Sequence, residues 1–458
     1  MNFWINKCDD EKPNKDFNNA FTFSLNKEGV AGVMYTNLSF TWEQMEIDCI
    51  STIYEDLFVI GMSIFSIDKR VSRRKFKDCW TRELKVSIPV IELEKWEKTI
   101  ELWNKTLSFL TGDIWKVTFR KSLHQYSKRE HNRRKKINIR SCDSVCLFSG
   151  GLDSFCGAID ILNAGKSPCL FGHNEYPKLR FKQEQLCKMF NKNYPNQTIK
   201  FLSFTANSRA PYNSEGLLKG SENTSRGRSL LFLCAALAIA STLGSEAPVY
   251  IPENGFIGLN IPLTNSRKGT CSTRTTHPYF IKCFQQILQT VEIKNEIKNP
   301  FAYKTKREIV NLVKNTDSFN EGFGLTISCS HPCLPRWNRD GLNEYPMNCG
   351  YCYPCLIRGS SLLDVSKSKF DRYSFLGNTK DFINEYSRSE KSNDLYATIS
   401  SVYRYKNSSD NEIKRLIQCT GKLTEEEVDK FLHVYKETMK DLVELFSVNQ
   451  DFKDYVGI

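Results

Sequence analysis

Between a strand pattern and a helix pattern, the chain reads Ser149-Gly150-Gly151-Leu152-Asp153-Ser154. The preceding residues 145–148 are apolar and typical of a strand, and residues 155–162 carry apolar side chains at helical spacing. Two glycines let such a turn approach an anion closely, while backbone N–H groups and the helix N-terminus supply positive potential. The pattern therefore predicts a phosphate-binding loop, against the alternative of an ordinary glycine-rich turn.

The side chains of this loop suit a nucleotide. Ser149 and Ser154 offer hydroxyl donors, and Asp153 can hold Mg²⁺ or a water molecule next to it. No Gly-Lys-Ser/Thr sequence ends the loop, so it is not a Walker loop. It resembles the PP-loop of ATP pyrophosphatases, which cleave ATP between the α and β phosphates and leave an adenylate. This resemblance implies that residues 149–154 bind ATP and Mg²⁺.

After residue 143 the chain alternates between strand and helix patterns. Strands are expected at residues 144–148, 168–172, 198–204 and 248–252, and helices at residues 154–164, 179–192 and 228–243. This alternation is typical of a doubly wound parallel sheet, which binds ligands at the carboxyl ends of its strands. The predicted fold class is therefore α/β, of the PP-loop, adenine nucleotide alpha hydrolase-like kind.

A chain of 458 residues is too long for one compact core. We predict an N-terminal α+β domain over residues 1–125, a basic linker over 126–142, the PP-loop domain over 143–364 and a helical extension over 365–458. In the N-terminal domain, strands are expected at residues 57–65, 84–90 and 113–119 and a helix at 92–109. This domain shows no recognisable cluster of catalytic residues. In the extension, residues 424–446 form the clearest helix pattern.

The amino-acid composition limits the kinds of ligand and partner that we expect. The net charge of +12, from 64 basic and 52 acidic residues, favours anionic ligands. No stretch reaches the roughly 18 apolar residues that cross a bilayer, and early acidic residues interrupt any signal-sequence pattern. We therefore expect a cytoplasmic protein without a membrane partner, whose 17 cysteines stay reduced. The basic run at 128–140 is interpreted as a linker, and nucleic acid is not an expected partner.

Four cysteines form the second chemical pattern. Cys349, Cys352 and Cys355 follow one another at two-residue gaps, and Cys329 precedes them. Such gaps let one turn direct two thiolates at the same ion, so the set predicts a closed, structural Zn²⁺ site. An iron–sulfur cluster is the alternative metal group, and Cys333 is the alternative to Cys329 as fourth ligand.

Together, the loop and the cysteines resemble 7-cyano-7-deazaguanine synthase over residues 143–363. The resemblance includes Leu-Phe-Gly at 170–172, Ser-Arg-Gly-Arg at 225–228 and the segment 304–310. It implies that ATP adenylates 7-carboxy-7-deazaguanine, that ammonia gives the amide, and that a second activation gives the nitrile. The site residues that follow are Asp153, Ser154, Arg226 and Arg228 for catalysis, with Phe171, Gly172 and His173 joining residues 149–154 around the nucleotide.

The chain departs from these synthases on the acceptor side. Phe-Gly-His-Asn-Glu at 171–175 replaces Tyr-Gly-Gln-x-His, and Arg-Gly-Arg-Ser at 226–229 replaces Pro-Gly-Arg-Asn. The chain is also much longer, and Leu-Thr-Gly-Asp-Ile-Trp at 110–115 is similar to a segment of the synthase-like proteins of bacterial anti-phage (Qat) defence systems. This second resemblance implies that the N-terminal amine of a partner protein from the same operon can replace ammonia as acceptor.

Two alternatives stay open at this point. One is a housekeeping 7-cyano-7-deazaguanine synthase of queuosine-precursor synthesis, and the other is an inactive nucleotide-binding scaffold of a defence complex. A tRNA thiolase has less support, because Cys156 is the one cysteine close after the loop. A homodimer is compatible with the sequence. We expect the N-terminal domain to bind a partner or to cover the mouth of the site.

Overall fold

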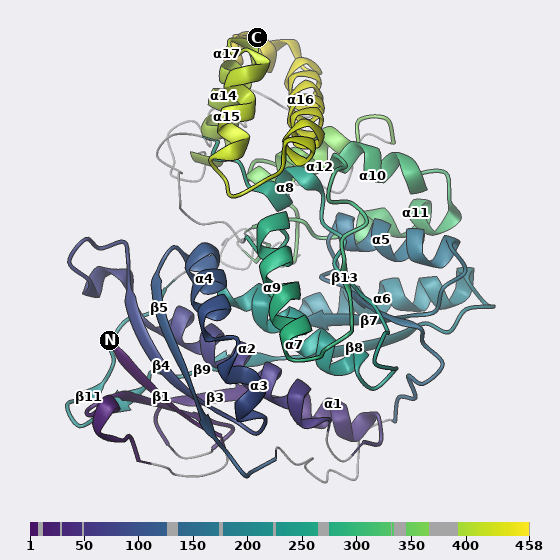
Figure 1. Cartoon of the computed structure of the whole chain (residues 1–458). Helices are drawn as coiled ribbons and strands as arrows, with labels where there is room; N and C mark the ends of the chain where they lie inside the picture. The colour runs from purple at the N-terminus through teal and green to yellow at the C-terminus, as the bar shows by residue number, and fades with distance from the viewer. Residues whose placement is uncertain are drawn as a thin grey trace.

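The computed structural model describes residues 1–7, 12–27, 30–47, 50–125, 136–173, 177–222, 226–263, 274–330, 332–333, 345–365 and 393–457. The protein is α/β, with two mostly parallel sheets and helices packed on them (Figure 1). A group of C-terminal helices stands at one end of the molecule, at the top of Figure 1. None of the described helices combines the length and the apolar character that crossing a membrane requires.

The second sheet carries the predicted phosphate loop. Its strands pair in parallel in the order β13 (Ile297–Lys298), β12 (Val249–Tyr250), β6 (Ser144–Leu147), β7 (Pro168–His173), β8 (Lys200–Phe204). Successive side chains of β6 face opposite sides of the sheet, so Val145 and Cys146 belong to different hydrophobic cores. All four strands predicted between residues 144 and 252 are present.

Helices cover both faces of this sheet. One face packs against α7 (Gly227–Ala240) and α9 (Pro278–Thr290). The other packs against α5 (Leu152–Asn163), α6 (Pro177–Asn193), α10 (Lys306–Val313) and α11 (Asp317–Gly322). The predicted α/β class with a parallel sheet is therefore confirmed, and the three predicted helices correspond to α5, α6 and α7.

β6 is the strand at which the order of the sheet reverses. The chain continues from β6 to β7 and β8 on one side, and β12 and β13 are added later on the other side. Parallel sheets leave a crevice at such a point, outside the carboxyl ends of the two neighbouring strands. The loop after β6 and the residues after β12 therefore lie next to each other.

The first sheet has eight strands. Those from the N-terminal region are β1 (Asn2–Asn6), β2 (Phe21–Leu25), β3 (Val33–Thr36), β4 (Glu83–Val90) and β5 (Ile114–Lys121). They pair in parallel, which is closer to α/β than to the predicted α+β arrangement. The chain between β8 and α7 adds β9 (Ala206–Ser208), β10 (Tyr212–Asn213) and β11 (Gly216–Leu217) in antiparallel pairing. Residues 206–217, predicted within the second domain, thus complete the sheet of the first.

The strand predicted at residues 57–65 is wrong, because these residues lie inside the long helix α2 (Thr52–Arg70). Nearly every side chain from Tyr54 to Asp68 is buried. A helix that is enclosed on all sides needs no polar face, so its apolar residues form a continuous run instead of a 3.6-residue period. Such a run is indistinguishable from a buried strand by pattern alone.

Helix α2 joins the two halves of the molecule. It lies between the first sheet and α7, while α4 (Ile100–Thr111) packs against β5 and α9. The side chains of both sheets and of these four helices belong to one continuous hydrophobic core. The shorter elements of the N-terminal region are η1 (Lys15–Phe17), α1 (Leu38–Gln44), η2 (Arg73–Lys75) and α3 (Leu93–Glu97).

The described part of the predicted C-terminal extension, residues 393–457, is helical. It comprises α14 (Asn393–Lys406), α15 (Asp410–Gln418), α16 (Glu425–Ser447) and α17 (Gln450–Val456). Thr424 caps α16 through a reciprocal pair of hydrogen bonds with Glu427. α16 packs on α8 (Gly255–Leu259), α10 and α12 (Tyr353–Ser361), and η4 (Phe323–Leu325) precedes α12.

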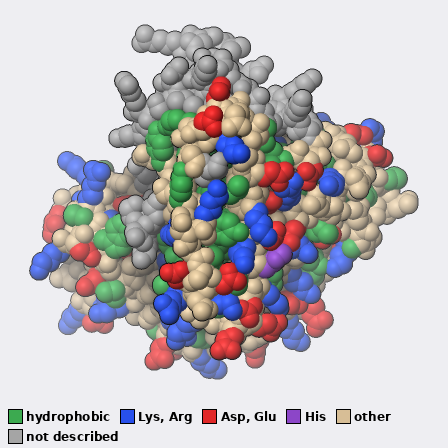
Figure 2. All heavy atoms as spheres, turned by 90° about the horizontal axis from the view of Figure 1, so that it is seen from above, with side chains coloured by type: hydrophobic (Ala, Val, Ile, Leu, Met, Phe, Trp, Pro, Cys, Tyr) green, Lys and Arg blue, Asp and Glu red, His purple; other side chains and the backbone are tan. Residues whose placement is uncertain are grey.

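The charge of the molecule is mixed on the face seen from above. Figure 2 shows Lys and Arg side chains interspersed with Asp and Glu side chains among the described residues there. Much of the predicted basic linker, residues 126–135, lies outside the described residues. The basic run therefore stays an interpretation from sequence.

Candidate functional site

The glycine-rich loop forms a tight turn from β6 into α5. Gly150 has φ of +81°, a left-handed conformation that strongly favours glycine. The Ser149 and Ser154 hydroxyl oxygens lie 3.1 Å apart, and Ser154 donates to the Gly151 carbonyl at 3.0 Å. The N–H groups of Gly151 and Leu152 each donate a 3.2 Å bond to a hydroxyl oxygen, that of Ser149 and of Ser328 respectively. The loop thus already directs two N–H groups at oxygen acceptors.

Asp153 points from the first turn of α5 into a buried polar group. Its Oδ2 atom accepts a hydrogen bond from Asn254 Nδ2 at 2.8 Å and lies 3.0 Å from Lys306 Nζ. The Asp153 and Lys306 side chains are only 9% and 6% exposed. Among the described residues, the buried Oδ1 atom of Asp153 has no hydrogen-bond partner. One oxygen of this carboxylate therefore remains able to bind a proton donor or a cation.

Glu253 is a second acid beside Asp153. Burial, reinforced by the neighbouring carboxylate of Asp153, raises the pKa of Glu253 well above its usual range. Asp153 lies in the first turn of α5, which follows β6, and Glu253 follows β12, the strand adjacent to β6. Two acids at the carboxyl edge of a parallel sheet can share one proton or hold one divalent cation.

Sequence reasoning missed Glu253, Asn254 and Lys306. Glu253 and Asn254 follow the strand predicted at 248–252, and that position was the available signal. Lys306 belongs to the segment 304–310, which is part of the resemblance to the synthases, but sequence reasoning assigned no function to this lysine. The Thr305 side chain caps α10 in a reciprocal pair with Glu308, which fixes Lys306 at the start of the helix.

A cavity of about 310 Å³ opens beside the loop. Its walls include Ser149 and Ser154 on one side, Glu253 at the end of β12, and Arg228 from α7. The aromatic residues in its lining are Phe148, Phe171, Phe204 and Phe232. The predicted nucleotide residues Phe171, Gly172 and His173 line the same cavity. The lining therefore combines polar groups of the loop with apolar, aromatic side chains.

His173 is neutral in this cavity at physiological pH. Burial, together with the nearby positive charge of Arg228, lowers its pKa to about 3. Its ring lies 4.6 Å from that of Phe232 and 5.4 Å from that of Phe204, measured between centroids. A neutral imidazole packed in this way is a hydrogen-bonding group of the cavity and not a cation for phosphate.

The two arginines predicted for catalysis occupy different surroundings. Arg228 lines the cavity. Arg226 donates a hydrogen bond to the Thr111 carbonyl at the end of α4, and it is not among the cavity-lining residues. The structure therefore brings Ser154 and Arg228 to one cavity and directs Arg226 towards the N-terminal region. Asp153 is not among the lining residues and lies beside Glu253, which is one of them.

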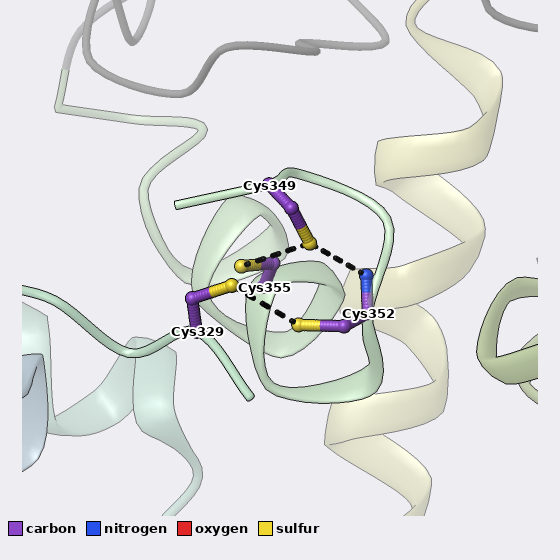
Figure 3. Close-up of side chains that lie close together, drawn as sticks. All are labelled: Cys329, Cys349, Cys352 and Cys355. Carbon is purple, nitrogen blue, oxygen red and sulfur yellow. Dashed lines mark hydrogen bonds between the residues drawn. The ribbon is translucent and has the colours of Figure 1, made fainter. Parts of the chain in front are cut away.

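The four predicted cysteines form a compact cluster (Figure 3). All four sulfur atoms lie within 4.8 Å of one another, with Cys329–Cys352 and Cys349–Cys355 separations of 3.9 Å. Zn–S bonds of about 2.3 Å in a tetrahedron place the sulfurs about 3.8 Å apart, so the cluster fits one zinc ion. The Cys352 N–H group donates to the Cys349 sulfur at 3.3 Å. Among the described residues, the cluster that could hold a metal includes Cys329, and Cys333 is not a member of it.

The cysteine cluster is tied to the loop by the chain that carries Cys329. Ile327 N–H donates to the Gly150 carbonyl at 2.9 Å, and Ser328 accepts from Leu152 N–H. Asn348, next to Cys349, accepts from Ser328 N–H at 2.9 Å. A metal at the cysteines would therefore stabilise the segment that holds the loop.

In a comparison with protein-family models, no family matches this sequence.

Proposed function

We propose that this protein is an ATP-dependent ligase that adenylates a carboxylate and releases pyrophosphate. The observation that carries the proposal is the strand–loop–helix turn at residues 148–154. Its Asp153 lies 3.0 Å from Lys306, and its Ser149 and Ser154 line one cavity with Arg228. A phosphate oxygen can replace the hydroxyl oxygens that accept from Gly151 and Leu152 N–H. The positive charges of Lys306 and Arg228 would offset the charge on the leaving pyrophosphate.

Mg²⁺ fits the acid pair. The free Oδ1 atom of Asp153 and the neighbouring Glu253 carboxyl supply the oxygen ligands that this ion prefers. Bound there, Mg²⁺ would neutralise charge on the phosphates and assist departure of pyrophosphate.

The aromatic side chains in the cavity lining indicate the substrate class. Phe171 and Phe204, whose rings stack on each other, form an apolar part of the wall with the half-buried Phe232, and neutral His173 offers a hydrogen bond to a heterocycle edge. We propose 7-carboxy-7-deazaguanine as the acid, following the resemblance stated above. Its carboxylate oxygen would attack the α-phosphorus as the bond to the pyrophosphate oxygen breaks, which needs no protein nucleophile.

The acceptor of the adenylate defines the biological role. Attack by an amine on the acyl carbon releases AMP and forms an amide, whether the amine is ammonia or the N-terminus of a partner protein. We propose the partner amine, in anti-phage defence, because residues 110–115 match that class of synthase-like protein. A housekeeping synthase shares the first step and differs in using ammonia alone.

The test is product analysis with ATP, Mg²⁺ and 7-carboxy-7-deazaguanine. We expect AMP and pyrophosphate, formed only when the acid is present, and loss of turnover in Asp153→Asn, which keeps the shape of the side chain. ADP as sole product, or no substrate-dependent turnover, would contradict the proposal, and the second result combined with tight ATP binding would favour a scaffold. Mass spectrometry of a candidate partner protein then distinguishes the two acceptors.

A further inference from the structure

The first turn of α7 is capped by another part of the chain. Arg226 precedes the helix without a side-chain cap. Asp68, in the last turns of α2, supplies the acceptor, because its Oδ2 receives the Gly227 N–H group at 2.7 Å. A buried carboxylate at this position satisfies an otherwise unpaired donor and interacts favourably with the helix dipole. The start of α7 is thus fixed by the N-terminal region.

Glycine at position 227 makes this contact feasible. A Cβ atom there would lie 3.1 Å from Phe65 Cα and 3.3 Å from the Ile64 carbonyl oxygen. Asp68 follows Ile64 by four residues, so both lie on the same face of α2. A larger residue at 227 would push the two helices apart and lengthen the bond to Asp68.

A second hydrogen bond to the N-terminal region holds Arg226, the residue before Gly227. Arg226 donates to the Thr111 carbonyl, which also accepts from Arg73 Nη2 at 3.0 Å. Thr111 belongs to the segment 110–115 that carried the resemblance to defence proteins. Asp113, in the same segment, accepts a hydrogen bond from Arg73 Nη1 at 2.6 Å. Thr111 therefore has a structural task, which is to anchor Arg226, whereas the Asp113 side chain bonds to Arg73 and Arg82.

Asp68 is itself held in a buried charge network. Arg82 Nη2 lies 2.5 Å from Asp68 Oδ1 and 2.6 Å from Asp113 Oδ2, and the Arg82 side chain is fully buried. Arg82 is adjacent to β4, so the network connects the start of α7 to the first sheet. The sequence did not predict this cluster of charges in the N-terminal region, because its members are far apart along the chain. Asp68 and Asp113 are separated by 45 positions.

We propose that Asp68 is a positioning residue for Arg228, so that the N-terminal region takes part in binding the nucleotide phosphates. Arg228 follows the two anchored residues directly and lines the cavity. The proposal rests on the proposed function, in which Arg228 faces the phosphates. Loss of the Asp68 bond releases the first turn of α7, and Arg228 then spends less time at the phosphate position.

The test measures binding of α,β-methylene ATP with Mg²⁺, since this analogue cannot be cleaved between its α and β phosphates. The variant is Asp68→Asn, whose single side-chain oxygen cannot serve both Gly227 and Arg82. The matched control is Asp113→Asn, which removes the other carboxylate of the same network. Among the described residues, the Asp113 side chain accepts hydrogen bonds from Arg73 and Arg82 and not from the start of α7. Both variants should lower the melting temperature. We expect about tenfold weaker binding for Asp68→Asn and less than about twofold for Asp113→Asn.

A double-mutant cycle separates positioning from general weakening of the fold. In an Arg228→Met background, Asp68→Asn should weaken binding by no more than about twofold, because its effect passes through the arginine already removed. An undiminished effect in that background, or equal losses in Asp68→Asn and Asp113→Asn, would overturn the proposal and leave the proposed function standing. A wild-type protein that does not bind the analogue would overturn both.

Discussion

At the scale of single residues, the site is a balance of buried charges. Asp153 is enclosed, and Lys306 and Asn254 offset the cost of burying its carboxylate. Burial and the neighbouring carboxylate of Asp153 raise the pKa of Glu253, and the positive charge of Lys306 opposes this shift. The sequence predicted Asp153 through a local motif. It did not predict Glu253 or Lys306, because these residues reach Asp153 only through the order of the strands.

This balance predicts the effect of removing the cation. Lys306→Met leaves Asp153 buried beside Glu253 without an ammonium group, so we expect the free energy of unfolding to fall by about 3 kcal/mol. The measurement is urea denaturation at pH 7.5. In the double variant Asp153→Asn/Lys306→Met the unpaired charge is absent, and most of the loss should be recovered. Equal destabilisation in the single and double variants would show that packing of the lysine, and not its charge, is what matters.

At the scale of elements, short connections decide the geometry of the site. The segment 326–329 bonds to the glycine loop and ends at the cysteine cluster, so the two chemical patterns of the sequence are physically joined. The cysteine spacing sufficed to predict the cluster, since three of its members lie in one local turn. The course of α2 could not be predicted from residues 57–65, because a fully enclosed helix loses the periodicity that identifies it.

The joined segment predicts what metal loss does. Cys352→Ser should reduce the zinc content from one ion per chain and lower the melting temperature, because folding of this region is coupled to metal binding. Nucleotide binding should weaken along with it, since Ile327 and Ser328 then hold the loop less firmly. Cys333→Ser is the matched control and should keep its zinc. Elemental analysis showing iron with sulfide, or a stable metal-free protein, would contradict the assignment.

The start of α9 predicts a pH dependence of stability. His277 Nδ1 accepts from Tyr279 N–H at 3.1 Å, and burial, with the positive charge of Arg274, lowers the pKa of His277 to about 3. Because the folded pKa lies below the ordinary value of about 6.5, this stability is present above pH 6.5 and is lost as the pH falls towards 3.

At pH 5 the loss from His277 amounts to about 2 kcal/mol. His277→Asn keeps an oxygen that can cap α9 but removes the titrating group. The unfolding free energy of this variant should therefore fall less steeply between pH 7.5 and 5, although His173 contributes a similar slope in both proteins. Parallel pH profiles for wild type and variant would rule out the role of His277.

At the scale of the whole molecule, the two sheets are parts of one structure. Their facing helices share a hydrophobic core, and strands from residues 206–217 complete the N-terminal sheet. The sequence predicted the alternation of elements in the second half because each strand and helix there has a local pattern. It could not predict that the first sheet borrows strands from the second half, since pairing between residues about 170 positions apart leaves no local signal.

This shared core predicts the fate of a shortened chain. A protein that begins at Lys136 would expose the surfaces of α7 and α9 that α2 and α4 now cover, and β9 and β10 would lose their partners β3 and β2. Exposed apolar surface and unpaired strand edges favour aggregation, so we expect residues 136–458 alone to be insoluble. Co-expression with residues 1–125 should restore a soluble complex that copurifies and binds zinc, as size-exclusion chromatography and elemental analysis would show. A shortened chain that is monomeric, zinc-loaded and stable by itself would mean that the N-terminal region is a separate domain after all.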